Sequence, residues 1–83
     1  MSWLIRIRCA EYEQELIDEK EVQEKELLPK SINEMLKKNN LTVCDPSGLT
    51  EDYFDCMSLL DDVAYVVSVF EKGTPDPYDR YAN

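Results

Sequence analysis

The side chains that could do chemistry in this sequence are mostly carboxylates, because none of its 83 residues is a histidine. Histidine is the commonest general base, the usual partner of a serine or cysteine nucleophile and the commonest zinc ligand. The three cysteines, Cys9, Cys44 and Cys56, form no CxxC pair, and we expect them to be reduced and mostly buried. A catalytic triad with histidine is therefore excluded, and an enzyme would have to use carboxylates alone.

The acidic residues do not match a known metal-binding pattern. The run at residues 18–21 lacks the alternating ligands and the central glycine of a calcium-binding EF-hand loop. Asp61 and Asp62 are adjacent, and neighbouring residues on a helix face different ways. The only glycines are Gly48 and Gly73, so a glycine-rich phosphate loop cannot form. We expect no metal, no cofactor and no enzymatic activity.

Length and composition predict one small domain. A chain of this size buries one modest core, and 43% hydrophobic with 33% charged residues is typical of a globular protein. The apolar residues near the N-terminus are interrupted at Arg6 and Arg8, which leaves too short a run for a signal peptide or a membrane span. We expect a soluble, cytoplasmic protein, including the cytoplasm of an infected host cell as a location.

Three segments have the pattern of β-strands. Residues 3–9 alternate between an apolar face and a face that carries two arginines, which is the period of a half-buried strand. Residues 63–70 are apolar on both faces, which predicts a central or doubly covered strand. Residues 41–44 form a short third strand, and residues 45–48 a type I turn after it.

The segments between these strands are predicted to be helices. Residues 11–28 are good helix formers with no glycine or proline, although a long charged loop is the alternative. Pro29 fits the first turn of a second helix, which ends with Lys37 and Lys38 and with an Asn39–Asn40 pair suited to a left-handed cap. Thr50 is a suitable N-cap for a third helix that ends at residues 61–62.

The predicted order is thus β-α-α-β-α-β. It indicates an α/β (or α+β) domain, residues 1–73, in which helices cover a small three-stranded sheet. Right-handed crossovers would make neighbouring strands parallel. Residues 74–83 hold two prolines without apolar periodicity and are predicted to be an extended or disordered tail, whose removal should leave the melting temperature nearly unchanged.

The net charge of −9 comes from two segments. Residues 11–28 hold eight acids and two lysines, and residues 41–62 hold six acids and no base. Direct binding of nucleic acid is disfavoured by this charge. We expect Arg6 and Arg8 to pair with the protein's own carboxylates.

The two acidic segments have two interpretations. They are either solvated faces that keep the chain in solution or surfaces that bind a basic partner, which complementary charge would select and accelerate. The second interpretation places partner-binding acids in both segments: Glu11, Glu15, Asp18, Glu19, Asp52, Asp55, Asp61 and Asp62. It adds Tyr53 and Phe54 as an aromatic contact, the alternative being that both rings pack into the core.

The function that these patterns favour is a non-enzymatic, acidic protein-binding module that covers a basic, nucleic-acid-binding surface of a partner protein. Phage-encoded inhibitors of host defence, toxin-immunity proteins and DNA mimics are the analogy, and fold and charge alone do not establish it. The alternative is a subunit of a homodimer or a larger complex, with the apolar faces of the third helix and the last strand as its interface. Salt should weaken the first kind of binding and preserve the second.

Overall fold

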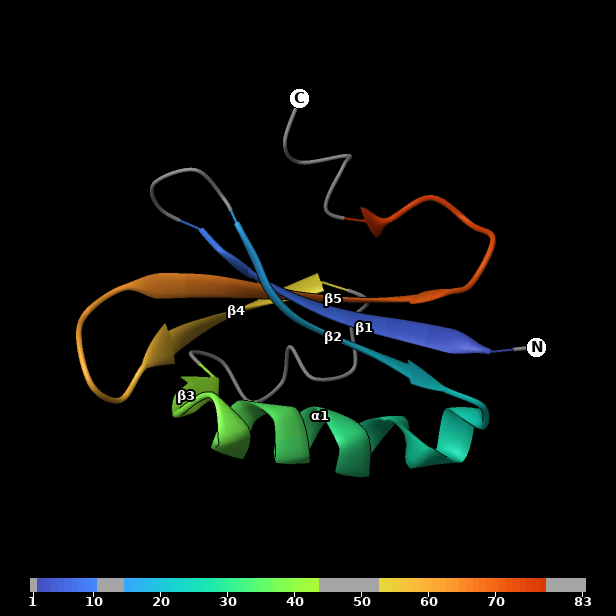
Figure 1. Cartoon of the computed structure of the whole chain (residues 1–83), viewed down its shortest axis with the longest axis horizontal. Helices are drawn as coiled ribbons and strands as arrows, with labels where there is room; N and C mark the ends of the chain where they lie inside the picture. The colour runs from blue at the N-terminus through green and yellow to red at the C-terminus, as the bar shows by residue number, and fades with distance from the viewer. Residues whose placement is uncertain (1, 11–14, 44–52, 78–83) are drawn as a thin grey trace.

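The computed structural model describes residues 2–10, 15–43 and 53–77, and in them a single sheet carries one α-helix on one face (Figure 1). The elements are β1 (Trp3–Cys9), β2 (Leu16–Val22), the 3-10 turn η1 (Lys25–Leu27), α1 (Leu28–Lys38), β3 (Leu41–Val43), β4 (Tyr53–Ser58) and β5 (Ala64–Glu71). The five strands lie in the order β2-β1-β5-β4-β3, and every neighbouring pair is antiparallel.

Several predicted elements are confirmed. The strand predicted at residues 3–9 is β1, and the strand predicted at residues 63–70 is β5, displaced by one residue. The third predicted strand is β3; Cys44 and the turn predicted at residues 45–48 lie outside the described residues. β5 occupies the middle of the sheet, as its apolar faces indicated.

The predicted fold class is wrong. The described residues form mostly a five-stranded antiparallel sheet with a single short helix, instead of three strands covered by helices in the order β-α-α-β-α-β. The helix predicted at residues 11–28 is replaced in its described part by β2, and the helix predicted at residues 50–62 by β4 and the turn after it. Tertiary pairing has overridden the local propensity of both segments.

The physical reason differs between these two strands. In β2, good helix formers are held in a strand by pairing along β1, where Arg6 lies directly opposite Glu19. In β4, Phe54 and Cys56 are buried while Asp55 and Met57 are exposed, which is a strand's period of two. The sequence also places Phe54 and Met57 three residues apart, and that coincidence produced the helical pattern.

The helix predicted after Pro29 is confirmed as α1. Proline stands in its first turn, and Ile32, Met35 and Leu36 are buried at helical spacing. The chain then leaves the helix through Asn40, whose φ of 57° is left-handed as predicted for this cap. The amide N–H of Asn39 donates to the carbonyl oxygen of Met35 at 3.1 Å.

The core lies between α1 and the face of the sheet turned towards it. At its centre Ile5, Ile7, Cys56 and Val67 have no exposed surface. The remaining members pack around them: Val22, Leu28, Ile32, Met35, Leu36, Leu41, Phe54 and Val69, with Trp3, Val43 and Tyr65 partly buried at the margin. Burial of the Cys56 thiol is confirmed, whereas Cys9 is only half-buried.

The segment after β5 turns back over the face of the sheet opposite α1 (Figure 1). Gly73 allows the turn, because its φ of 98° is strained for any residue with a side chain. Asp76 and Pro77 are buried. Residues 76–77 therefore lie against the sheet. The boundary after residue 73 and the extended or disordered tail at 74–83 stay a prediction, and residues 78–83 lie outside the described part of the chain.

The alternation in β4 predicts opposite effects at neighbouring positions. Phe54→Ala removes a ring that is 5% exposed, and we expect it to lower the free energy of unfolding by about 3–5 kcal/mol. Asp55→Ala, on the exposed face, should change it by less than about 0.5 kcal/mol. Urea denaturation of the two variants measures the difference, and equal effects would contradict the strand.

Candidate functional site

The arginines of β1 hold the acids nearest to them. Arg6 pairs with Glu19 of β2, and its Nη1 lies 3.1 Å from Asp76 Oδ2. Arg8 Nη2 lies 3.2 Å from the same Asp76 oxygen, and the Arg6 guanidinium stands 5.1 Å from the centre of the Phe70 ring. The prediction that Arg6 and Arg8 pair with the protein's own carboxylates is confirmed, and Asp76 is the member that the sequence did not indicate.

This cluster stabilises the charged form of Arg6. Partial burial by itself lowers the pKa of the guanidinium, but the hydrogen bonds and negative charges of Glu19 and Asp76 outweigh it, so that the pKa of Arg6 is raised. Asp76, with only 4% of its surface exposed, is compensated by two cations. The cluster fastens the C-terminal segment to the sheet and leaves little charge for a partner.

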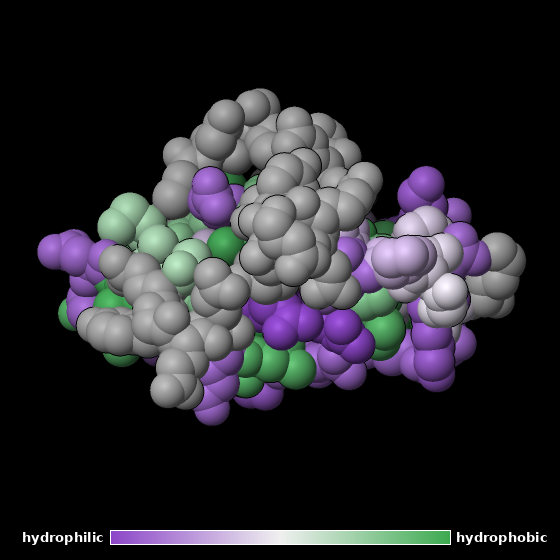
Figure 2. Space-filling view, turned by 90° about the horizontal axis from the view of Figure 1, so that it is seen from above, coloured by the Kyte–Doolittle hydropathy of each residue, from purple (hydrophilic) through white to green (hydrophobic). Residues whose placement is uncertain are grey.

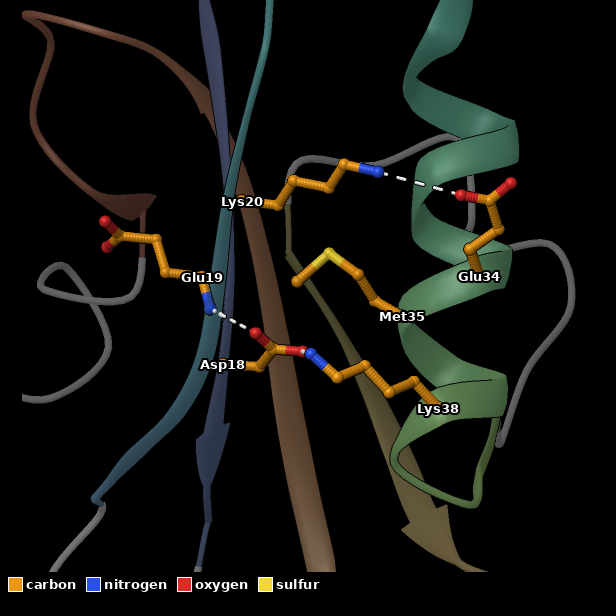
Figure 3. A pocket seen from close by; sticks show the side chains of 6 residues that line it. All are labelled: Asp18, Glu19, Lys20, Glu34, Met35 and Lys38. Carbon is orange, nitrogen blue, oxygen red and sulfur yellow. Dashed lines mark hydrogen bonds and ion pairs between the residues drawn. The ribbon is translucent and has the colours of Figure 1, made fainter.

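Asp18 is also used within the fold. Figure 3 shows Asp18 and Lys20 of β2 pointing towards α1, whereas Glu19 points to the opposite side of the strand. Asn39 Nδ2 donates to Asp18 Oδ2 at 2.9 Å and Lys38 Nζ lies 3.8 Å from it. With the ion pair between Lys20 and Glu34 at 3.6 Å, these contacts bridge a groove of about 310 Å³ between β2 and α1.

The backbone of β2 is protected at one position of its outer edge. The backbone N–H and C=O groups of the odd-numbered β1 residues point towards β2, as the hydrogen bond from Cys9 N–H to the Glu15 carbonyl oxygen shows. Asp18, which lies opposite Ile7, therefore points its backbone groups towards β1. The amide N–H of the next residue, Glu19, then points away from β1, to the outer edge of the sheet. This N–H donates to Asp18 Oδ1 at 2.9 Å. The register of the β1–β2 pair also shifts between Ile7 and Arg8, next to the position where Ile7 lies opposite Asp18.

The acids of the second segment are placed differently. Asp55 is exposed on β4, and Asp61 and Asp62 are exposed in the turn that joins β4 to β5. The sequence has no lysine or arginine between residues 39 and 71. Within the described part of the chain, none of the three carboxylates forms an ion pair. Among the described residues, the β4–β5 hairpin therefore carries three exposed carboxylates that no cation pairs with.

The aromatic contact predicted beside these acids is wrong for Phe54, which packs in the core. The backbone of Tyr53 begins β4, and its side chain is outside the described part of the chain. The exposed apolar residues of the hairpin are instead Leu59 and Leu60, at 66% and 78% exposure. Their position directly before two aspartates was the available signal, and it was missed because the segment was predicted to be a helix.

The remaining predicted binding acids are not brought to this surface. Glu15 is exposed before β2, at the other edge of the sheet, and Asp18 and Glu19 are engaged as described. Glu11 and Asp52 lie outside the described residues. Of the acids proposed from the sequence, the structure thus brings Asp55, Asp61 and Asp62 together on one hairpin.

The described residues were also compared with the requirements of a metal site and of a membrane span. Among the residues that the structure describes, no three cysteine, aspartate or glutamate side chains are close enough together to hold a metal ion. In residues 2–10, 15–43 and 53–77, no helix has the length and apolarity that crossing a membrane requires. The β4–β5 hairpin, with its exposed and unpaired carboxylates, is thus the candidate site among the described residues.

Comparison with known proteins finds no relative. No protein-family model matches the chain, and no curated protein and no solved structure matches it either. Function therefore has to be argued from the residues themselves.

The contact of Asp76 with two arginines predicts a stabilising role for the C-terminal segment, contrary to the expectation from the sequence. Asp76→Ala leaves both guanidinium groups without this acceptor, and we expect a loss of about 2 kcal/mol in the free energy of unfolding. Asp62→Ala, an exposed acid, is the control and should change it by less than about 0.5 kcal/mol. Thermal or urea denaturation compares them; equal stability of the two variants would refute the role.

The ion pair between Glu21 and Lys72 predicts a pH effect. Lys72 Nζ lies 2.8 Å from Glu21 Oε1, and Gln23 Nε2 donates to Oε2 at 2.9 Å. Lys72 and then Gln23 lower the pKa of Glu21, and the carboxylate raises the pKa of Lys72. Because the folded pKa of Glu21 is depressed, its stabilising contribution is present above the unfolded pKa and is lost as the pH falls through the folded value.

NMR titration of the side-chain carboxyl carbons measures this directly. Lys72→Met should move the Glu21 titration upwards towards its ordinary value, and Gln23→Ala should move it by a smaller amount. An unchanged titration in Lys72→Met would mean that the ion pair does not form in solution.

Proposed function

We propose that the protein is a non-enzymatic, acidic protein-binding module that binds a basic surface of a partner protein through its β4–β5 hairpin. The supporting observation is the exposed, uncompensated charge of Asp55, Asp61 and Asp62. Like charges held on one hairpin repel each other, and a basic surface relieves that repulsion. Charge complementarity of this kind accelerates association and selects the partner.

The rest of the charge distribution supports the choice of this hairpin. The acids of β2 lie beside Arg6, Lys38 and Lys72 and are largely neutralised where they stand. In the sheet, strand β1 lies between β2 and the β4–β5 hairpin. The whole chain has a net charge of −9. Within the described residues, the acids of the hairpin are not paired with cations.

Protein surfaces on which lysine and arginine side chains cluster commonly bind nucleic acid. We propose accordingly that the protein acts as an inhibitor or immunity-type protein, of the kind that phages direct against host defence, and covers such a surface as a DNA mimic would. Its place of action would be the cytoplasm, including that of an infected host cell.

The alternative proposal is a homodimer or a subunit of a larger complex, whose interface was expected on apolar faces of the predicted third helix and the last strand. The predicted third helix is a strand, and the apolar side chains assigned to the interface include Phe54, Cys56, Val67 and Val69, all of which lie in the core. Self-association stays a prediction for light scattering to test, and Met57, Leu59 and Leu60 are the residues of the predicted third-helix face that remain exposed.

Charge reversal tests the hairpin against the rest of the acidic surface. Asp55→Lys with Asp62→Lys changes two hairpin acids that accept no hydrogen bond in the described structure. Glu24→Lys with Glu26→Lys is the matched control, because it changes the net charge equally at exposed positions outside the hairpin. Each pair should leave the fold intact.

The measurement uses a basic partner captured from the native host, purified and mixed with each variant in a stopped-flow instrument. The hairpin variant should associate about 10-fold more slowly at low salt, and the difference should shrink as ionic strength rises. The native protein should also displace nucleic acid from the partner. Native association rates for the hairpin variant would refute the proposal.

A further inference from the structure

The turn at the tip of the β4–β5 hairpin exposes two leucines beside two aspartates. Leu60 is the most exposed large apolar residue of the described chain at 78%, Leu59 follows at 66%, and Met57 on the neighbouring strand is 37% exposed. At the end of the molecule where Figure 1 places this turn, Figure 2 shows hydrophobic and hydrophilic surface side by side. Apolar surface of this kind is costly to leave in water, so its position requires a reason.

The backbone of the tip is fixed by hydrogen bonds on both sides. The hydroxyl oxygen of Ser58 accepts from the amide N–H groups of Leu60 and Asp61 at 3.1 and 3.3 Å. Ser58 N–H donates to the Val63 carbonyl oxygen at 3.1 Å, and Leu59 N–H donates to the Asn40 carbonyl oxygen at 2.7 Å. These hydrogen bonds hold the backbone of the turn in place, and the leucine side chains that it carries are exposed.

We infer that Leu59 and Leu60 are the apolar anchor of the binding surface, and that they insert into an apolar pocket rimmed by lysine or arginine side chains on a partner protein. The inference rests on the proposed function and specifies its contact. Apolar anchors held rigidly at the centre of an interface supply most of its binding energy, because little conformational entropy is lost on binding. Asp61 and Asp62, next to the leucines in sequence, would face the basic rim.

Charge decides between this occupant and two others. A second copy of the chain joined by a two-fold axis would bring the same acidic tip against itself, and like charges facing each other oppose association. The headgroup surface of an anionic membrane repels the same aspartates. A protein pocket with a basic rim satisfies the leucines and the aspartates together.

Defined peptides test the inference without a known partner. The probes are an amphipathic helical peptide of lysine and leucine, a lysine peptide of equal charge without leucine, and the amphipathic peptide with every lysine replaced by glutamate. Fluorescence anisotropy gives the Kd of each, and ¹H–¹⁵N NMR titration of the full chain locates the contact. Leu59→Ser with Leu60→Ser is the test variant, and Leu16→Ser with Ile17→Ser, two apolar residues at 41% exposure each, is the matched control.

The amphipathic basic peptide should bind at least about 10-fold more tightly than the lysine peptide, as expected for an apolar hot spot. The largest amide shifts should centre on residues 58–63. The Leu59/Leu60 variant should lose this advantage and keep its weak, salt-sensitive affinity for the lysine peptide, while the control variant should retain the advantage. The glutamate peptide should not bind.

Other outcomes overturn the inference in distinguishable ways. If the two basic peptides bind equally, or if the test variant keeps the advantage, the leucines are not the anchor while the acidic surface still stands. If the lysine peptide does not bind at low salt, the proposed function fails as well. If sedimentation shows a dimer that the Leu59/Leu60 variant dissociates, the leucines bind a second copy instead of a basic partner.

Discussion

Strand β1 is the constraint on which the rest of the molecule depends, because it is paired along both edges and packed on both faces. β2 and β5 run beside it in antiparallel register. Ile5 and Ile7 point into the core beneath α1 without exposed surface. Arg6 and Arg8 point the other way and hold Asp76 of the C-terminal segment. The alternation of this one strand therefore places apolar side chains on one face of the sheet and charged side chains on the other. Helix α1 packs on the apolar face, and the C-terminal segment with Asp76 packs on the charged face.

The same separation explains why several acids of the described residues are paired with cations while others are not. Carboxylates that fall beside β1, α1 or the start of the C-terminal segment meet Arg6, Arg8, Lys38 or Lys72, and they contribute to the fold. In the described residues, Asp55, Asp61 and Asp62 of the β4–β5 hairpin form no ion pair, and Asp61 and Asp62 directly follow the exposed leucines. Net charge alone could not distinguish the two groups, because the distinction depends on which strands are neighbours.

The local sequence pattern identified the elements whose own side chains determine their secondary structure. It failed where pairing with a distant segment determines the secondary structure. The alternation of β1, the double apolar face of β5 and the proline-to-asparagine limits of α1 are properties of a few consecutive residues, and they were predictable. β2 is rich in glutamate and lysine, and only its neighbour β1 makes it a strand. Of the residues proposed to bind a partner, Asp55, Asp61 and Asp62 were named from composition, whereas the exposure of Leu59 and Leu60 required knowledge of the turn.

The hydrogen bond from the Glu19 amide to Asp18 bears on how the molecule avoids polymerising. An outer strand with free amide groups invites another strand to extend the sheet, and repeated extension leads to fibrils. At Glu19 the outward amide is already occupied, the register shifts nearby, and glutamates line the approach. At this position of the β2 edge, the Asp18 carboxylate occupies an amide with which the strand of a second copy would otherwise pair.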